Sequence, residues 1–260
     1  MRDRRPLHVA VVGKGGAGKS VIAGTLARLL ARRGRRVLAL DSDMLPGLTL
    51  SLGADAPALP PLLDAAERDE DGRWRLKRGI GPVRAVQRYA TDAPDGIRLL
   101  QAGKVGPEGL PAIMPALQAY YRVVHRLAGA AGLSDWAIVG DLPGGPRQAA
   151  FDWAPYADTF VLVVEPTSQS LLAARRITRV VSQRAPKHVV VVANKVRSGD
   201  DIERIQAFLA TSVAAAVPAD GAVAAAERSG GALVDAAPRS PAVEAIARLA
   251  ERLQAGTIGS

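Results

Sequence analysis

The chain has 260 residues, of which 48% are hydrophobic and 23% charged, and its formal net charge is +9. These proportions indicate a globular protein with a sizeable buried core. The absence of cysteine excludes disulfides and thiolate-bound zinc or iron–sulfur clusters within one chain. No apolar run is long enough to cross a bilayer, and residues 1–6 lack the apolar core of a signal peptide, so we expect a cytoplasmic protein.

Short arginine-rich clusters carry much of the positive charge. They lie at residues 4–5, 32–36 and 73–78. A charge surplus of this kind can attract nucleic acid or an acidic partner, but short clusters are more typical of a solvated surface. We therefore expect a basic arm at residues 1–6 and leave non-specific DNA binding open.

The first forty residues predict a β–α–β unit. Residues 7–12 are mostly apolar and β-branched, as in a central parallel strand covered on both faces. Residues 20–33 carry apolar side chains at helical spacing, and Gly34 is placed to end that helix. Residues 37–40 form a second buried strand, so the chain begins as a doubly wound α/β domain begins.

The remaining elements extend the same pattern. Further strands are predicted at residues 73–77, 97–101, 136–139, 160–164, 189–193 and 213–217. Further helices are predicted at residues 110–131, with Pro115 able to kink it, at 168–184 and at 241–254. We predict one doubly wound, mostly parallel sheet with helices on both faces, forming a single domain over residues 1–260. The last helix is amphipathic without aromatic residues, so we expect it to dock on the domain rather than on a membrane.

Between the first strand and the first helix lies the sequence GKGGAGKS, residues 13–20. It fits the phosphate-binding pattern G-x-x-x-x-G-K-[ST], in which backbone N–H groups cradle the phosphates. In that pattern Lys19 reaches the β- and γ-phosphates and the Ser20 hydroxyl ligates Mg²⁺. We expect the nucleotide to be bound by Gly13, Gly15, Gly16, Ala17, Gly18, Lys19, Ser20 and Val21.

The same glycines also spell G-x-G-x-x-G, the dinucleotide fingerprint, with Asp41 or Asp43 at the distance of a ribose-binding acid. A NAD(P)-binding oxidoreductase of Rossmann type is therefore an alternative. The pyrophosphate of a dinucleotide is bound by backbone groups and the helix dipole, so it requires neither Lys19 nor Ser20. A triphosphate with Mg²⁺ needs a cation and a hydroxyl. The triphosphate is favoured.

Two aspartates follow predicted strands and complete a site for phosphoryl transfer. Asp43 is a candidate to orient the attacking water, and Asp141 is a candidate to hold Mg²⁺ together with Ser20. Each alone is more simply explained as a helix cap or turn residue. Their position beyond two strand ends, where α/β sheets bind ligands, favours the functional interpretation.

Lys14 is a second lysine inside the loop. With it, the sequence closely resembles the deviant Walker A ATPases of the MinD/ParA/ArsA superfamily, whose loop reads K-G-G-x-G-K-[ST]. The resemblance implies that Lys14 crosses a dimer interface to the phosphates of the other subunit, that Lys14, Lys19 and Asp43 are catalytic, and that ATP and Mg²⁺ are the cofactors. It also implies that Asn194 reads the adenine and that Pro218 and Asp220 line the base pocket.

The segments at residues 165–171 and 240–243 look most like the CooC subgroup, which acts in nickel insertion. This chain lacks the subgroup's Cys-x-Cys pair, so transfer of nickel through thiolates is excluded. It also has Met44 where family members often have proline after Asp-x-Asp, which leaves the geometry of the first switch open.

The sequence thus predicts a Mg–ATP-dependent switch that dimerises on ATP binding, hydrolyses ATP to ADP and phosphate, and acts on a client protein, such as a metalloenzyme under maturation. The alternative within the same superfamily is a spatial organiser of the ParA or MinD type that binds DNA or membrane. The client itself is not identified by the sequence.

Overall fold

The computed structural model describes residues 6–44, 47–106, 109–145, 152–183 and 187–256. Its centre is an eight-stranded sheet in the order β10-β9-β8-β1-β7-β2-β6-β5, in which β5 alone is antiparallel to its neighbour. The strands are β1 (His8–Gly13), β2 (Val37–Asp41), β5 (Thr91–Ala93), β6 (Ile97–Gln101), β7 (Ala137–Asp141), β8 (Thr159–Val164), β9 (His188–Val196) and β10 (Val213–Pro218).

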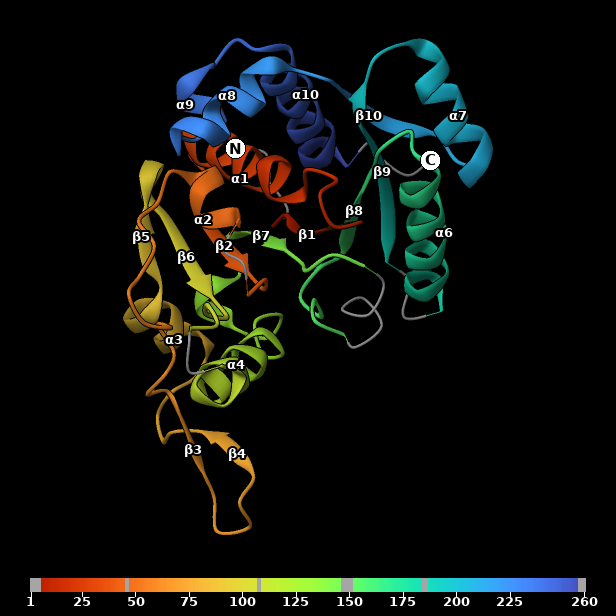
Figure 1. Ribbon diagram of the computed structural model, residues 1–260. Coiled ribbons are helices and arrows are strands. Elements are labelled where there is room, and N and C mark those ends of the chain that lie inside the picture. Colours follow the sequence, from red (N-terminus) through yellow and green to blue (C-terminus); the bar gives the residue numbers. More distant parts are fainter. Residues whose placement is uncertain (1–5, 45–46, 107–108, 146–151, 184–186, 257–260) are drawn as a thin grey trace.

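Helices cover both faces of this sheet (Figure 1). One face is covered by α1 (Lys19–Arg32), α2 (Gly47–Leu52), α8 (Gly221–Ser229), α9 (Leu233–Ala236) and α10 (Pro241–Ala255). The other is covered by α3 (Pro82–Tyr89), α4 (Leu110–Val124), α6 (Ser168–Ser182) and α7 (Gly199–Leu209). Two one-turn 3₁₀ helices, Pro94–Gly96 and Ala131–Leu133, stand in connections. The predicted doubly wound, mostly parallel fold is confirmed.

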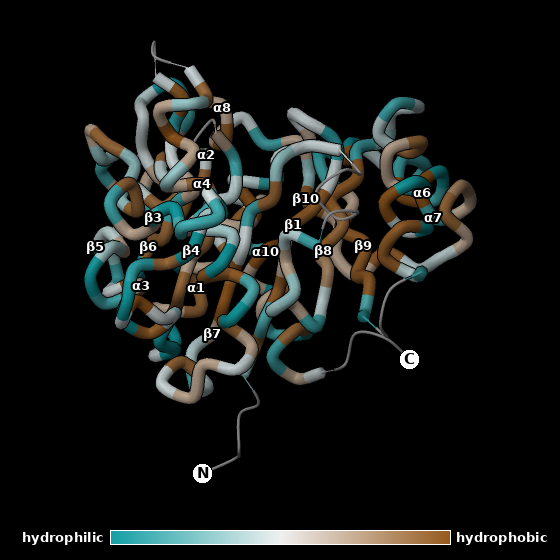
Figure 2. The backbone as a smooth tube through the Cα atoms, turned by 90° about the horizontal axis from the view of Figure 1, so that it is seen from below, coloured by the Kyte–Doolittle hydropathy of each residue, from teal (hydrophilic) through white to brown (hydrophobic). Residues whose placement is uncertain are grey.

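Each face of the sheet has its own hydrophobic core, because alternate residues of a strand point to opposite faces. In β2, Leu38 and Leu40 belong to the core under α4 and α6, whereas Val37 and Ala39 belong to the core under α1 and α10. Figure 2 shows the hydrophobic residues concentrated along β8, β9 and β10.

The carboxyl-terminal helix α10 packs along α1 and β10. Ser240 caps it by accepting a hydrogen bond from the Val243 backbone N–H, and Ile246 and Leu249 are completely buried. No helix within the described ranges is long and apolar enough to cross a membrane.

A hairpin of β3 (Ala66–Arg68) and β4 (Trp74–Leu76) projects from the domain beside α4 (Figure 1). The sequence predicted the second of these strands but not the first. The predicted helix at 110–131 is also too long, since α4 ends at Val124 and is followed by turns. Pro115 is accommodated inside α4. The expected basic arm lies mostly outside the described residues, which begin at Pro6.

Candidate functional site

The glycine-rich loop runs from the end of β1 to the start of α1. A Cβ at Gly13 would lie 2.5 Å from the carbonyl oxygen of Val163, so only glycine fits beside β8. Gly18 has φ of +90°, a left-handed conformation that turns the chain into α1 at Lys19. The Lys14 carbonyl accepts hydrogen bonds from the Ala17 N–H at 3.2 Å and the Lys19 Nζ at 3.4 Å. These hydrogen bonds fold the loop back on its own backbone. Lys19, the first residue of α1, is 93% buried.

Asp141 meets the loop at the carboxyl end of β7. The Ser20 hydroxyl donates to Asp141 Oδ2 at 2.5 Å, and Asp141 is 1% exposed. Burial raises the pKa of Asp141 to about 6, against the lowering effects of the Ser20 hydrogen bond and the Lys19 charge. Ser20 and Asp141 meet because β1, which leads into the loop, pairs with β7. In that pairing Val11 lies opposite Asp141.

Asp41 lies opposite Asp141 in the register of β2 and β7 and is completely buried. Burial, followed by the negative charge of Asp141, holds the pKa of Asp41 well above its ordinary value. Sequence analysis offered Asp41 as a ribose ligand and, by resemblance, as part of the first switch, but did not place it beside Asp141. The signal in the sequence was its position at the end of a predicted buried strand, but the adjacency of that strand to the strand of Asp141 comes from the structure.

These residues fit Mg²⁺. Among the described residues, Asp41 Oδ2 and Asp141 Oδ1 are buried without a hydrogen-bond partner. An unpaired buried carboxylate oxygen is costly, and carboxylate and hydroxyl oxygens are the ligands that Mg²⁺ prefers. The Ser20 hydroxyl completes this donor set.

The segment after β2 carries Asp43 alongside the loop. The Asp43 N–H donates to Asp41 Oδ1 at 3.1 Å, and the Ser42 N–H donates to the Asp141 carbonyl at 3.1 Å. Asp43 is half-buried and Met44, which follows it, is 39% exposed. The predicted water-orienting residue therefore lies at the rim of the site, tied by its backbone to the buried carboxylates.

The segment after β7 folds against the loop. A Cβ at Gly144 would lie 2.8 Å from the Gly15 nitrogen, and the Gly145 N–H donates to the Gly13 carbonyl at 3.0 Å. The two glycines thus allow close approach of two backbones, which brings their N–H groups to the phosphate-binding loop.

Two residues at the end of β9 hold the outer side of the loop. Asn194 Nδ2 donates to the Ala17 carbonyl at 2.7 Å, and Lys195 Nζ donates to the Gly16 carbonyl at 2.8 Å. Lys195 also pairs with Glu165 at 2.7 Å. In the sequence, Asn194 and Lys195 begin like a guanine-binding N-K-x-D motif, and nothing in the spacing indicates the contact of Lys195 with the loop.

A cavity of about 790 Å³ lies between the phosphate-binding loop and the ends of β9 and β10. Its lining includes Gly16, Lys19, Ser20, Asn194 and Pro218. Val21 and Asp220 also line it. The Asp220 carboxylate accepts from the N–H groups of Ala222 at 2.9 Å and Ala242 at 3.1 Å, so it caps both α8 and α10. The structure thus brings part of the loop (Gly16, Gly18, Lys19 and Ser20) around one cavity with Val21, Asn194, Pro218 and Asp220, whereas the predicted Gly13, Gly15 and Ala17 do not line it. Asp141 contacts Ser20.

Comparisons with known proteins agree with this geometry. Residues 9–244 match the CobQ/CobB/MinD/ParA nucleotide binding domain. The chain is 29% identical over 262 residues to the carbon monoxide dehydrogenase accessory protein CooC of Rhodospirillum rubrum, covering 95% of this chain and 97% of that protein.

Two solved structures share the fold. The cell division ATPase MinD of Pyrococcus furiosus superposes with a TM-score of 0.71 at 22% identity, covering 95% of this chain and 98% of that one. MinD of Pyrococcus horikoshii complexed with Mg-ADP gives a TM-score of 0.68 at 22% identity, covering 95% and 96%. The chain belongs to the CobQ/CobB/MinD/ParA family of nucleotide-binding domains, as an ATP-binding P-loop protein of the MinD/ParA superfamily near CooC.

Proposed function

We propose that this protein is a Mg–ATP-dependent dimerisation switch that hydrolyses ATP to ADP and phosphate and acts on a partner protein. The contact between Ser20 and Asp141, at 2.5 Å and beside the buried Lys19, carries the proposal. It joins the end of the phosphate-binding loop to a buried carboxylate, as a Mg²⁺-bound triphosphate requires. A dinucleotide would need neither group.

Each residue has a task in this proposal. Backbone N–H groups of the loop and Lys19 bind the phosphates, and the start of α1 adds the positive end of its dipole. Ser20, Asp141 and Asp41 hold Mg²⁺, which neutralises charge on the phosphates when bound. Asp43 orients the attacking water from the rim of the site.

Lys14 is assigned to the second subunit's nucleotide. Its carbonyl is held within the loop, but no described residue accepts a hydrogen bond from its side-chain amine. Lys14 is half-buried and is followed by the exposed Gly15 and Gly16. A lysine supplied across an interface ties hydrolysis to dimerisation, as an arginine finger does.

Two variants test the switch. Lys14→Ala should lose ATP hydrolysis while retaining ATP binding, and Lys14→Arg should recover part of the rate. Hydrolysis at the wild-type rate in Lys14→Ala would refute the action of this lysine on the other subunit's nucleotide.

Asp43→Ala should elute as a dimer with ATP and Mg²⁺ and as a monomer with ADP. A monomer under both conditions would contradict dimerisation.

Adenine is the base we assign to the cavity. Asn194 keeps its carbonyl oxygen and second N–H for a base while its first N–H holds the loop. Pro218 and Asp220 line the same cavity. Position 197 is Arg, so the aspartate of a guanine-binding N-K-x-D motif is missing. Competition of ATP, GTP and NAD for binding measures this choice directly.

The client is proposed to be a protein, because CooC is named as an accessory protein of another enzyme. A membrane role is disfavoured, since the apolar face of α10 is buried against α1 and β10.

DNA is the second candidate for the partner. Arg175, Arg176 and Arg179 are exposed along α6. ATP-dependent, salt-sensitive binding to non-specific duplex DNA would favour it, and affinity capture with Asp43→Ala would favour a client protein.

A further inference from the structure

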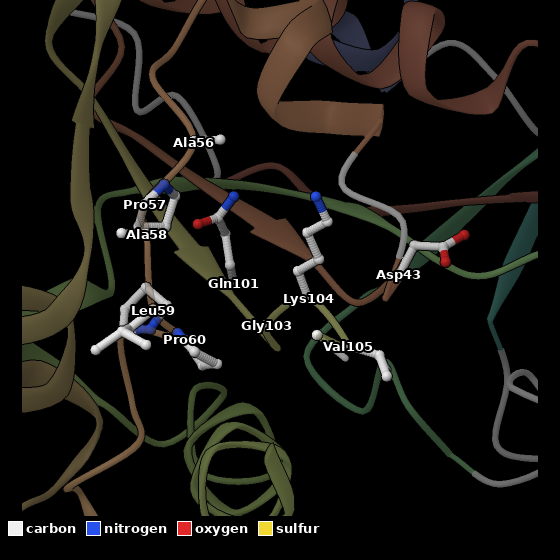
Figure 3. A pocket seen from close by; sticks show the side chains of 12 residues that line it. Asp43, Ala56, Pro57, Ala58, Leu59, Pro60, Gln101, Gly103, Lys104 and Val105 are labelled. Atoms are coloured by element: carbon white, nitrogen blue, oxygen red, sulfur yellow. The ribbon is translucent and has the colours of Figure 1, made fainter. Parts of the chain in front are cut away.

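A second cavity lies beside the proposed hydrolysis site. It has a volume of about 340 Å³ and opens where β2 and β6 end, with Asp43 on one side and a proline-rich segment on the other (Figure 3). Its remaining wall is formed by Gln101 and residues 103–106. Small-molecule sites usually start at about 300 Å³, so this cavity is the size of a small ligand.

The wall opposite Asp43 is rigid. Pro57, Pro60 and Pro61 line it, and proline fixes the backbone φ angle. Gly103 has φ of +112°, and a Cβ at this position would lie 2.8 Å from the Pro60 Cβ. The two segments therefore pack closely enough that only glycine fits between them. A site formed before its ligand arrives loses less conformational entropy on binding.

The charged and amide side chains of this cavity are Lys104, which offers a cation to an anionic ligand, Gln101, and Asp43, whose carboxylate lies on another wall. The Lys104 side chain is exposed and reaches into the cavity, and no described residue pairs with its amine. Gln101 is 96% buried; its Nε2 donates one N–H to the Thr49 hydroxyl, and its Oε1 is buried without a hydrogen-bond partner among the described residues. In Figure 3 the ends of the Gln101 and Lys104 side chains extend toward the same side of the cavity. The second N–H of the Gln101 amide and the Lys104 ammonium make a donor pair for one carboxylate.

The rest of the lining is apolar. Pro57, Leu59, Pro60 and Val105 offer hydrocarbon surface within the same cavity, and Leu59 is 68% exposed. An aliphatic chain attached to the anion would cover this surface. The protein's net charge of +9 adds a general attraction for anions.

We propose that this cavity is a second ligand site, which takes a short organic carboxylate and couples its binding to that of ATP through Asp43. Lys104 and Gln101 hold the carboxylate, and the aliphatic part lies against Pro57, Pro60 and Val105. Because Asp43 borders both sites, occupancy of the cavity changes the affinity for Mg–ATP, and Mg–ATP changes the affinity for the carboxylate by the same factor. The coupling rests on the role proposed for Asp43, whereas binding of the carboxylate does not.

The binding test uses hexanoate as the probe, with hexanamide as a neutral probe of the same shape and acetate as the charge without the chain. Hexanoate should shift the amide NMR signals of Asp43 and residues 103–105 saturably at millimolar concentration, in the absence of nucleotide. Hexanamide and acetate should bind at least tenfold more weakly. Lys104→Met should lose the saturable shift, while Lys77→Met, which removes an exposed charge on the distant hairpin, should retain it. No saturable shift with hexanoate, or an equal shift in Lys104→Met, overturns the site.

The coupling test uses a non-hydrolysable ATP analogue with Mg²⁺. Its dissociation constant should change at least threefold when the cavity is saturated with hexanoate, and the change should vanish in Lys104→Met. An unchanged constant in the wild type overturns the coupling. Neither measurement requires hydrolysis, so failure of the proposed ATPase activity would be seen separately, as an absence of phosphate release.

Discussion

The hydroxyl groups of Tyr120 and Ser42 lie 2.8 Å apart in the protein interior, and they join α4 to the segment that carries Asp43. Tyr120 is 1% exposed and Ser42 is 2% exposed, so water does not compete for this hydrogen bond. Ser42 stands between the buried Asp41 and the rim residue Asp43. The positions of α4 and of the segment 41–43 are therefore linked by one side-chain contact.

Removing that contact should weaken both stability and hydrolysis. Tyr120→Phe keeps the ring but leaves the Ser42 hydroxyl without its partner, so we expect the free energy of unfolding to fall by about 1–2 kcal/mol. ATP hydrolysis should fall several-fold with the KM for ATP unchanged, because Asp43 is less well positioned. Urea denaturation and steady-state kinetics measure the two effects. In the double mutant with Ser42→Ala, the second substitution should cost less than it does alone, and full additivity would rule out the coupling.

Tyr156 gives a matched comparison with the opposite sign. Its ring is buried, but its hydroxyl has no hydrogen-bond partner among the described residues and lies against Gly140. Tyr156→Phe removes an unsatisfied buried hydroxyl, so the free energy of unfolding should stay equal or rise by about 1 kcal/mol. The same urea experiment decides it, and a loss as large as that of Tyr120→Phe would show that the hydroxyl has a partner.

Arg28 of α1 forms a buried ionic bridge to two distant segments. Its side chain is 3% exposed and contacts Asp95 at 2.6 Å and Asp235 at 2.9 Å, and it donates to the Leu52 carbonyl at 2.5 Å. Arg28→Met should lower the free energy of unfolding by about 1–2 kcal/mol, since it leaves the Leu52 carbonyl without its donor and the two aspartates with Arg32 alone. Arg32 contacts the same two aspartates but is 37% exposed, so Arg32→Met should cost less than about 1 kcal/mol. Thermal or urea denaturation that ranks the two variants equally would contradict this assignment.

The raised pKa of Asp141 predicts a pH dependence of stability. Burial raises the pKa to about 6 from 3.8, so the folded protein binds this proton more tightly than the unfolded chain does. Without Mg²⁺ and nucleotide, the contribution to stability is complete below pH 4 and is lost as the pH rises through 6. Asp141→Asn should remove this loss and be more stable than the wild type at pH 7, by at most about 3 kcal/mol. Denaturation at pH 4.5, 5.5 and 7 tests it, and parallel pH profiles of the two proteins would count against it.

Strong sequence patterns predicted most of the fold. The buried parallel strands were found because each is a run of apolar, often β-branched residues, and α1 was found from its helical spacing. The strands β3 and β5 were missed because their residues do not alternate between apolar and polar, as residues 73–77 around the equally short β4 do. Helix α7 was missed although Ser198 and the acidic Asp200 and Asp201 are a helix-start signal.

The local motif predicted the phosphate-binding loop, but contacts between distant segments had to come from the structure. Asp41 faces Asp141 because β2 lies beside β7, and a chain of local patterns does not give strand order. The contact of Lys195 with Gly16 and the cavity between residues 56–61 and 103–106 likewise depend on which loops meet. Whether Lys14 acts across a dimer interface stays a prediction.

The pairing of Asp41 with Asp141 is fixed by strand register, and register changes only in steps of whole residues. An insertion or deletion inside β2 or β7 would turn one carboxylate to the opposite face of the sheet and abolish the pair at once. Apart from Gln101, the last residue of β6, the segments that form the cavity beside Asp43 lie outside the strands, where changes of length are better tolerated than inside a strand. Related chains can therefore diverge in the molecules they respond to while inheriting the same phosphate chemistry unchanged.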